Sequence, residues 1–297
     1  MTKLVPLSDA IAAYVNDGDV LYAAGFTHLI PFAAGHEIIR QGKRDLTLAR
    51  ATPDLIYDQM VAAGCARKVI FSYMGNPGVG SLRLVRSAIE QGRLEWEEYS
   101  HFGMITRLQA GAAGLPFLPM NQTGATDLEQ ANPNIKRIPD PFGGKDVIVV
   151  PALHPDVAIV HVQRADANGN AHLWGIIGEQ KEAAFAAKKV ILTAEEIVEE
   201  SIIRSDPNRT MIPGLVVSAV CHVPFACHPS YAQGYYDRDN DFYVAWEPIS
   251  REPAALKSYL DQFVYGVRDR AEYVERCGGL ERLRAASRVC EGVNYGY

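Results

Sequence analysis

The chain has 297 residues, of which 48% are hydrophobic and 22% are charged, and its formal net charge is −6. This composition is typical of a globular protein and excludes disorder and collagen-like repeats. The negative charge argues against a nucleic-acid partner, which needs an excess of Lys and Arg. Apolar runs such as Val147–Val150 are far shorter than the roughly 20 residues of a membrane-spanning helix, and the N-terminus shows no signal peptide. We therefore expect a soluble, cytoplasmic protein without a membrane partner.

The cysteine pattern favours neither disulfides nor a metal site. An odd number of cysteines without a CxxC pair does not predict a disulfide framework. Cys221-His222 and Cys227-His228 carry residue types that bind zinc, but their spacing fits a strand leaving the core better. We predict no metal. The cysteines are Cys65, Cys221, Cys227, Cys277 and Cys290.

Short apolar runs alternate with amphipathic segments over the first 114 residues. Gly, Pro, Ser and Asp at the boundaries mark where helices start and stop. Strands alternating with helices of this length predict a parallel sheet that is covered on both faces. The expected strands are 19–24, 46–50, 68–73 and 94–99, and the expected helices are 7–15, 31–42, 54–63, 81–92 and 100–114.

The second half continues the alternation after a polar connection over 120–145. Loops of that length are usually functional or form interfaces. An Asn-Gly pair at 168–169 predicts a hairpin turn. We expect one α/β domain over 1–297, with an open, mostly parallel sheet covered by helices on both faces and a C-terminal helical extension at about 250–297. The expected strands are 147–153, 157–164, 189–193 and 215–223, and the expected helices are 179–187, 194–204 and 252–287.

A parallel open sheet binds ligands beyond the carboxyl ends of its strands, so the loops there are the candidate site. Gly25-Phe26-Thr27-His28 follows a strand and precedes a helix. A glycine at this point lets backbone amides approach an anionic oxygen, and the helix start adds partial positive charge. A tight turn without a ligand is the alternative for this loop. His28 is the histidine we single out, because it directly follows these residues.

A second glycine-rich loop covers 72–80 and follows a predicted strand. Its backbone donors could bind a carboxylate or a phosphate, whereas a flexible connection is the simpler interpretation. No Lys follows its last glycine, so it is not a nucleotide-binding P-loop.

Three pairs of adjacent glutamates invite an acid–base interpretation. On a strand, neighbouring side chains point to opposite faces, so Glu97 and Glu98 cannot share a substrate. We expect Glu195-Glu196 and Glu199-Glu200 to lie on the exposed face of a helix. None of the three pairs is predicted to be catalytic.

Several segments, in this order along nearly the whole chain, resemble the α subunit of family I CoA-transferases, and the glutaconate CoA-transferase type in particular. The resemblance implies the family's α/β fold, which is similar to that of sugar-phosphate isomerases. The segments are Asp17-Gly18-Asp19, Gly25-Phe26-Thr27, Glu37 to Gly42, Leu115 to Pro119, His161 to Asp166, Leu173-Trp174-Gly175 and His228-Pro229-Ser230.

The resemblance also implies a reaction. A glutamate attacks an acyl-CoA thioester, the released CoA forms a glutamyl-CoA intermediate, and an acceptor carboxylate reverses the sequence. In this family the glutamate belongs to a homologous β subunit, so we expect a heterodimer or an α2β2 heterotetramer and nominate no glutamate here. CoA enters as a thioester substrate, and no permanently bound cofactor is expected. The connection 120–145 and the aromatic stretch after Pro229 are the interface candidates.

The family's Gly-Gly-Phe loop lies on the oxyanion side of the site, and here it reads Ala24-Gly25-Phe26. The amides of Gly25 and Phe26 are the expected oxyanion donors. We expect the acyl or carboxylate group to be held by Thr27, His28, Ser72, Asn76 and Gln122.

Two other functions compete with CoA transfer. Relatives on the same fold include hydrolases that open a steroid ring and decarboxylases of glutaconyl-type CoA esters. The sequence Glu98-Tyr99-Ser100-His101-Phe102 is similar to the transferase type, because ring-opening relatives place an acidic residue where His or Phe stands here. A ligand-sensing domain of a regulator is the third alternative, but no basic helix-turn-helix accompanies it.

Overall fold

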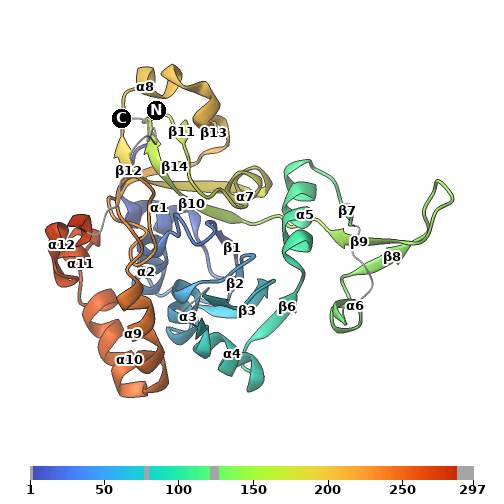
Figure 1. Cartoon of the computed structure of the whole chain (residues 1–297), viewed down its shortest axis with the longest axis horizontal. Coiled ribbons are helices and arrows are strands. Elements are labelled where there is room, and N and C mark those ends of the chain that lie inside the picture. The colour runs from blue at the N-terminus through green and yellow to red at the C-terminus, as the bar shows by residue number, and fades with distance from the viewer. Residues whose placement is uncertain (1–2, 77–79, 121–126, 286–297) are drawn as a thin grey trace.

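A nine-stranded, mostly parallel sheet forms the centre of the molecule in this computed structural model (Figure 1). The structure describes residues 3–76, 80–120 and 127–285. Parallel strands lie in the order β14, β12, β10, β1, β2, β3 and β6. At the end of β10, β11 pairs antiparallel with β10, and β13 pairs antiparallel with β11. Their bounds are β1 Val20–Ala23, β2 Leu46–Ala49, β3 Ala66–Phe71, β6 Glu95–Glu98, β10 Val157–Ala165, β11 Ala171–His172, β12 Lys189–Ile197, β13 Thr210–Ile212 and β14 Ala219–His222.

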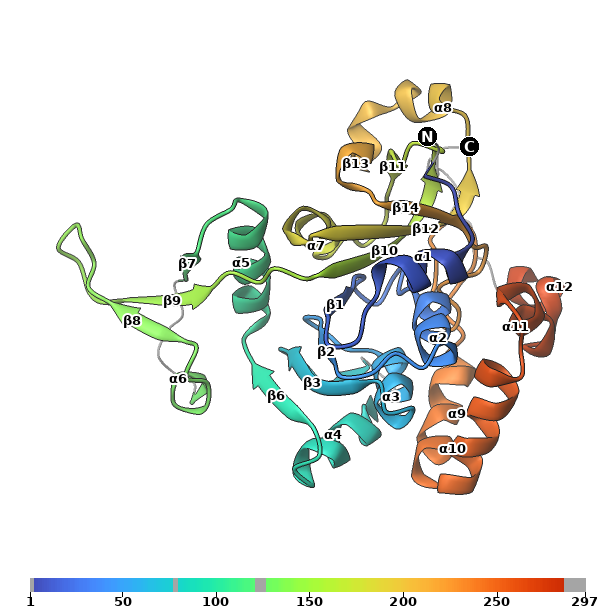
Figure 2. The same ribbon diagram turned by 180° about the vertical axis from the view of Figure 1, so that it is seen from behind.

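Helices cover both faces of this sheet, as the alternation of elements predicts (Figures 1 and 2). One buried cluster joins the sheet to α1 Leu7–Tyr14, α2 Phe32–Arg40, α3 Leu55–Ala62, α4 Arg83–Glu90, α9 Asn240–Arg251 and α10 Pro253–Leu260. The other joins the opposite face to α5 His101–Ala112 and α7 Gln180–Ala186, and it reaches α11 Arg270–Arg276 and α12 Gly279–Ala285. The central strand β10 is buried along its whole length, which fits a sheet covered on both sides.

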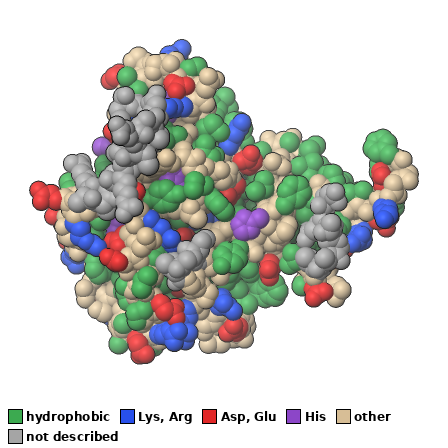
Figure 3. Space-filling view, viewed as in Figure 1, with side chains coloured by type: hydrophobic (Ala, Val, Ile, Leu, Met, Phe, Trp, Pro, Cys, Tyr) green, Lys and Arg blue, Asp and Glu red, His purple; other side chains and the backbone are tan. Residues whose placement is uncertain are grey.

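Three strands form a separate antiparallel sheet, which we call the arm. They are β7 Phe117–Met120, β8 Lys136–Ile138 and β9 Val147–Pro151, and the short helix α6 Leu128–Ala131 lies between β7 and β8. The arm extends away from the body of the molecule (Figure 1). Phe142, in the turn between β8 and β9, is 95% exposed, and a hydrophobic group stands at the far end of the arm in Figure 3.

Several predicted element boundaries are wrong. The strand expected over 215–223 is β14 only from Ala219 to His222, and the connection expected over 120–145 contains α6 and β8. The segment expected as a helix over 194–204 is strand β12 up to Ile197, and only Glu200–Ser205 is helical (α8). The C-terminal helices begin at Asn240, because α9 continues through Pro248, a residue that normally interrupts a helix. The predicted hairpin forms between β10 and β11. None of the described helices is long and apolar enough to cross a membrane.

Candidate functional site

The candidate site lies where β1, β2, β3 and β6 end, because their carboxyl ends meet at one edge of the parallel sheet. The segment 24–29 follows β1, and we call it the β1 loop. Thr52 follows β2, Ser72 follows β3, and His101 starts α5 directly after β6. The sheet therefore gathers short segments that are well separated along the sequence.

The β1 loop has an unusual backbone. Gly25 has a φ of +135°, and a Cβ atom there would lie 2.8 Å from the His28 carbonyl oxygen and 2.9 Å from that of Leu29. Thr27 and Leu29 have φ values of 56° and 55°. Residues other than glycine rarely adopt this left-handed backbone conformation, so the surrounding structure must hold the loop in place. Only glycine fits at position 25.

Contacts from the segment that follows β14 hold the β1 loop. Ser230 Oγ donates a hydrogen bond to the Thr27 carbonyl oxygen at 2.8 Å, and the Leu29 amide donates to the Tyr231 carbonyl oxygen at 2.9 Å. Two strained residues of the loop are thus tied to a segment that is distant in the sequence. We call this segment, residues 223–236, the clamp segment.

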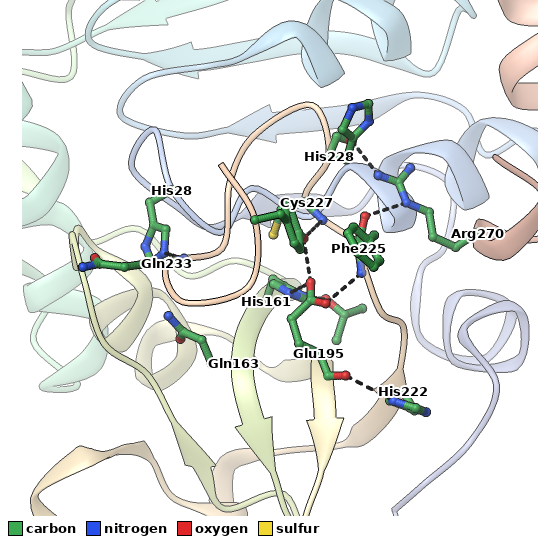
Figure 4. Close-up of polar contacts among 12 residues, drawn as sticks. His28, His161, Gln163, Glu195, His222, Phe225, Cys227, His228, Gln233 and Arg270 are labelled. Carbon is green, nitrogen blue, oxygen red and sulfur yellow. Dashed lines mark hydrogen bonds and ion pairs between the residues drawn. The ribbon is translucent and has the colours of Figure 1, made fainter. Parts of the chain in front are cut away.

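The imidazole of His28 adds a third tie to the clamp segment (Figure 4). Its Nε2 accepts a hydrogen bond from the Gln233 amide at 2.9 Å, so its proton is on Nδ1, which lies 3.2 Å from the Ile176 carbonyl oxygen. Burial lowers the pKa of His28 to about 4. The neutral ring holds the loop and has no nitrogen left for a ligand in this arrangement.

The buried carboxylate of Glu195 holds the clamp segment through hydrogen bonds (Figure 4). Its carboxylate accepts hydrogen bonds from the Phe225 amide at 2.8 Å and the Tyr236 hydroxyl at 2.6 Å, and it lies 2.8 Å from His161 Nε2. The prediction that Glu195 lies on an exposed helix face is therefore wrong: it is a buried residue of β12. Buried carboxylates need such partners, and these partners all come from distant segments.

A candidate metal site overlaps with this network. Ligand atoms of His161, Glu195 and Cys227 lie within 4.8 Å of one another. The His161–Glu195 contact is a hydrogen bond, and burial raises the pKa of the Cys227 thiol well above its usual value. Because a thiol binds zinc as the thiolate, these residues favour a hydrogen-bonded anchor over a metal centre.

Ser72 and His101 form the opposite wall of the site. The Ser72 hydroxyl donates to the Ala51 carbonyl oxygen at 2.5 Å, so it accepts at 2.8 Å from His101 Nδ1. His101 Nε2 then accepts from the Thr52 hydroxyl at 2.7 Å. Partial burial lowers the pKa of His101. Its ring packs perpendicular to that of Phe26, with the ring centroids 6.0 Å apart, so the β1 loop and the Ser72–His101 wall are in contact here.

A cavity of about 330 Å³ opens beside Ser72. The sequence interpretation did not place Glu98 here, because it judged Glu97 and Glu98 only as a pair that cannot share a substrate. Burial raises the pKa of Glu98, whereas Glu97 turns to Lys68 and to the Tyr99 hydroxyl. The cavity is lined by Phe71, Ser72, Tyr73, Met74, Arg86, Ile89, Glu90 and Glu98.

The other residues that the sequence predicts for the site lie at several places in the structure. Phe26 and Thr27 are partly exposed, whereas Gly25 is buried. Phe26 pairs with His28 in an isolated bridge, and no other backbone hydrogen bond of the Gly25 and Phe26 amides is found in the described part of the chain. Asn76 belongs to the two-residue strand β4 (Gly75–Asn76). Gln122 lies outside the described residues.

Comparisons with known proteins agree with this architecture. The family model described as coenzyme A transferase matches residues 6–222. One subunit of the 3-oxoadipate CoA-transferase from Pseudomonas knackmussii is 51% identical over 92% of this chain and 97% of its own length. The solved glutaconate CoA-transferase from Acidaminococcus fermentans is 34% identical and superimposes with a TM-score of 0.91, covering 99% of this chain and 98% of the solved chain.

A third relative has a different chemistry. The solved decarboxylase AibA/AibB has a TM-score of 0.75 and 31% identity, covering 88% of this chain and 99% of its own. The family itself is fixed by the match over 6–222 together with the two CoA-transferase relatives. The chain belongs to the coenzyme A transferase family, in which it is an α subunit.

Proposed function

We propose that this chain, paired with its β subunit, transfers CoA to a small dicarboxylate, and that 3-oxoadipate is the preferred acceptor. The observation that carries the proposal is the 51% identity to a 3-oxoadipate CoA-transferase subunit over nearly the full length of both chains. Identity to the glutaconate enzyme is 34%. Acyl-CoA is the second substrate, and no permanently bound cofactor takes part.

The proposed chemistry uses the β1 loop as an oxyanion site. A carboxylate oxygen attacks the thioester carbonyl carbon, the negative charge moves to the carbonyl oxygen, and the C–S bond then breaks to release CoA thiolate and leave a mixed anhydride. The thiolate attacks the enzyme's acyl carbon and expels the substrate carboxylate. The amides of Gly25 and Phe26, whose only recorded backbone pairing among the described residues is the short Phe26–His28 bridge, suit the developing charge. One such donor is worth roughly 10²–10³ in rate.

We propose that the attacking carboxylate belongs to the β subunit. Glu98 lines the cavity beside Ser72, which makes it the internal competitor. Mass spectrometry of the separated subunits after incubation with acyl-CoA distinguishes the two. A CoA adduct on the β subunit, retained in Glu98→Gln, supports the proposal, and an adduct on this chain that disappears in Glu98→Gln contradicts it.

Thr27 and Ser72 are the proposed contacts for the substrate carboxylate, together with Asn76 and Gln122. Thr27 is partly exposed beside the loop amides. Ser72 borders the cavity, and its hydroxyl would turn from the Ala51 carbonyl oxygen to donate to the substrate carboxylate. His28 contributes by holding the loop, through both of its ring nitrogens.

The arm is the proposed contact with a homologous β subunit in a heterodimer or an α2β2 assembly. The CoA-transferase relatives are each named as one subunit of their enzyme, which implies a second, partner chain. A projecting sheet that ends in a phenylalanine with 95% of its surface exposed is unfavourable in water, and exposed apolar groups of this kind mark protein interfaces.

The decisive experiment is co-expression with a homologous β subunit and an assay of matched substrate pairs. Succinyl-CoA or acetyl-CoA is offered with 3-oxoadipate, glutaconate or acetate, and all acyl-CoA species are quantified. New 3-oxoadipyl-CoA that forms faster than glutaconyl-CoA supports the proposal. Glutaconyl-CoA as the faster product refutes the acceptor assignment, and CoA release or loss of CO₂ without an acceptor refutes transfer.

A further inference from the structure

Arg50 is a cation in the core directly behind the candidate site. It follows β2, is 0% exposed, and is among the largest fully buried side chains. Its Nη2 donates to the Gly25 carbonyl oxygen at 2.6 Å. Its Nε and Nη1 have no hydrogen-bond partner in the described part of the chain. A buried guanidinium with unused donors is costly, so packing alone does not explain it.

Two buried carboxyl groups partly balance the positive charge of Arg50 through electrostatic interaction. The buried Asp54 and Glu179 both have pKa values that burial raises, and the positive charge of Arg50 opposes that rise. Tyr22 and Tyr57 complete the surroundings, and the same charge lowers the pKa of both against the effect of burial. The direct hydrogen bond of the guanidinium nevertheless goes to a backbone carbonyl of the β1 loop.

That carbonyl fixes the direction of an amide. In a planar trans peptide, the C=O of one residue and the N–H of the next point in opposite directions. Because Arg50 draws the Gly25 oxygen into the core, the Phe26 N–H points away from the core. Phe26 and Thr27 are the partly exposed residues of this loop, so the N–H points to the side from which a substrate approaches.

We infer that Arg50 is a positioning residue that sets the Gly25–Phe26 peptide in the orientation required for oxyanion binding. The inference rests on the proposed function of the β1 loop. Glycine at position 25 makes the peptide easy to turn over, and the other ties of the loop hold Thr27, His28 and Leu29. Arg50 is the side chain that holds the carbonyl of Gly25 itself.

The test compares Arg50→Met, Arg50→Lys and the wild type in the assembled αβ enzyme. Met keeps the length and removes the donor, and we expect kcat to fall about 10²-fold with KM for acyl-CoA changed by less than about threefold. Lys keeps one donor and the charge, so its kcat should lie between the two. Arg107→Met is the matched control, because Arg107 is buried, has an Nη1 that makes an ion pair but no hydrogen bond among the described residues, and donates to the Pro151 carbonyl oxygen. We expect it to lower stability without lowering kcat.

A second measurement keeps the inference separate from the proposed function. Deuterium exchange of the peptide that contains Phe26 reports the loop without any substrate. Faster exchange at the hydrogen-bonded amides of this peptide, those of Ala24 and Leu29, in Arg50→Met and not in Arg107→Met supports positioning even when no acyl-CoA is turned over. Equal exchange and equal kcat in a folded, assembled Arg50→Met enzyme would overturn the inference. Absence of transfer in the wild type would refute the proposed function alone.

Discussion

Ser230 Oγ lies 2.8 Å from the carbonyl oxygen of Thr27, and 203 positions of sequence separate the two residues. Thr27 has a φ of 56°, which a threonine adopts only when its surroundings hold it. The geometry of the candidate site is therefore set by the clamp segment as much as by the loop itself.

Replacement of Ser230 by Ala removes this tie. We expect the free energy of unfolding to fall by about 1 kcal/mol and kcat to fall further than stability alone explains, because the loop loses one of its anchors. Ser250→Ala is the control, since Ser250 is also buried and donates to a carbonyl at 2.9 Å, but inside α9. Equal kcat in the two variants would contradict the role of the clamp.

A methyl group at Gly25 should inactivate the enzyme. The new Cβ would stand 2.8 Å from the His28 oxygen, so the backbone must move and the loop amides with it. We expect a loss of kcat of at least about 10²-fold in steady-state assays. Gly18→Ala also places Ala at positive φ but meets no heavy atom within 4 Å, so it should cost about 1 kcal/mol of stability and leave kcat unchanged.

The neighbours Glu195 and Glu196 should respond very differently to replacement by Gln. Gln at 195 presents an NH₂ group to donors that now face a carboxylate, and we expect a loss of about 2–4 kcal/mol in urea unfolding. The side chain of Glu196 is 42% exposed in its pair with Arg164, so Glu196→Gln should cost less than about 1 kcal/mol. Similar losses would show that Glu195 is not the anchor.

The low pKa of His28 predicts a pH dependence of stability. The folded-state pKa of about 4 lies below the ordinary value of 6.5, so the neutral ring contributes its full stability above pH 6.5. As the pH falls toward 4, the unfolded chain takes up the proton and this contribution is lost. A shift of this size corresponds to about 3 kcal/mol.

The measurement for His28 is the difference in unfolding free energy between the wild type and His28→Gln at a series of pH values. We expect the difference to shrink between pH 6.5 and 4. A flat difference for His28→Gln would mean that its ring is not held neutral in the fold.

Phe142 should matter for assembly and not for folding. It is 95% exposed, so Phe142→Glu leaves the melting temperature of this chain alone unchanged, while its affinity for the β subunit falls by at least about tenfold. Leu215→Glu is the comparison, because Leu215 is 84% exposed on the body. Calorimetric titration with the β subunit gives both affinities. An unchanged affinity for Phe142→Glu would remove the arm from the interface.

Much of the fold follows from local pattern. Runs such as 46–50 and 157–164 became β2 and β10, because buried parallel strands are short, apolar and bounded by turn residues. Local pattern failed at Glu195, where two adjacent glutamates resemble a solvated helix surface until distant donors are in place. It also failed at Pro248, which α9 accommodates in its interior.

Part of the site could also be predicted from local sequence pattern. Gly25 was found because a glycine between a strand and a helix is a local signal. Arg50 and Gln233 were not singled out, since an arginine after a strand and a glutamine in a polar stretch are ordinary surface residues in sequence. Their roles come from the hydrogen bonds that the tertiary structure creates across the sheet.

The last strand of the sheet, β14, ends at His222, and the family model ends at the same residue. The clamp segment comes afterwards, and so does its hydrogen bond to the β1 loop. During synthesis on the ribosome, all strands of the main sheet have left the ribosome once residue 222 has emerged. At that stage the β1 loop still lacks its hydrogen bond from the clamp segment. The first part of the site to be synthesised is thus the last to be fixed in place, and a chain that ends shortly after β14 would have no competent site.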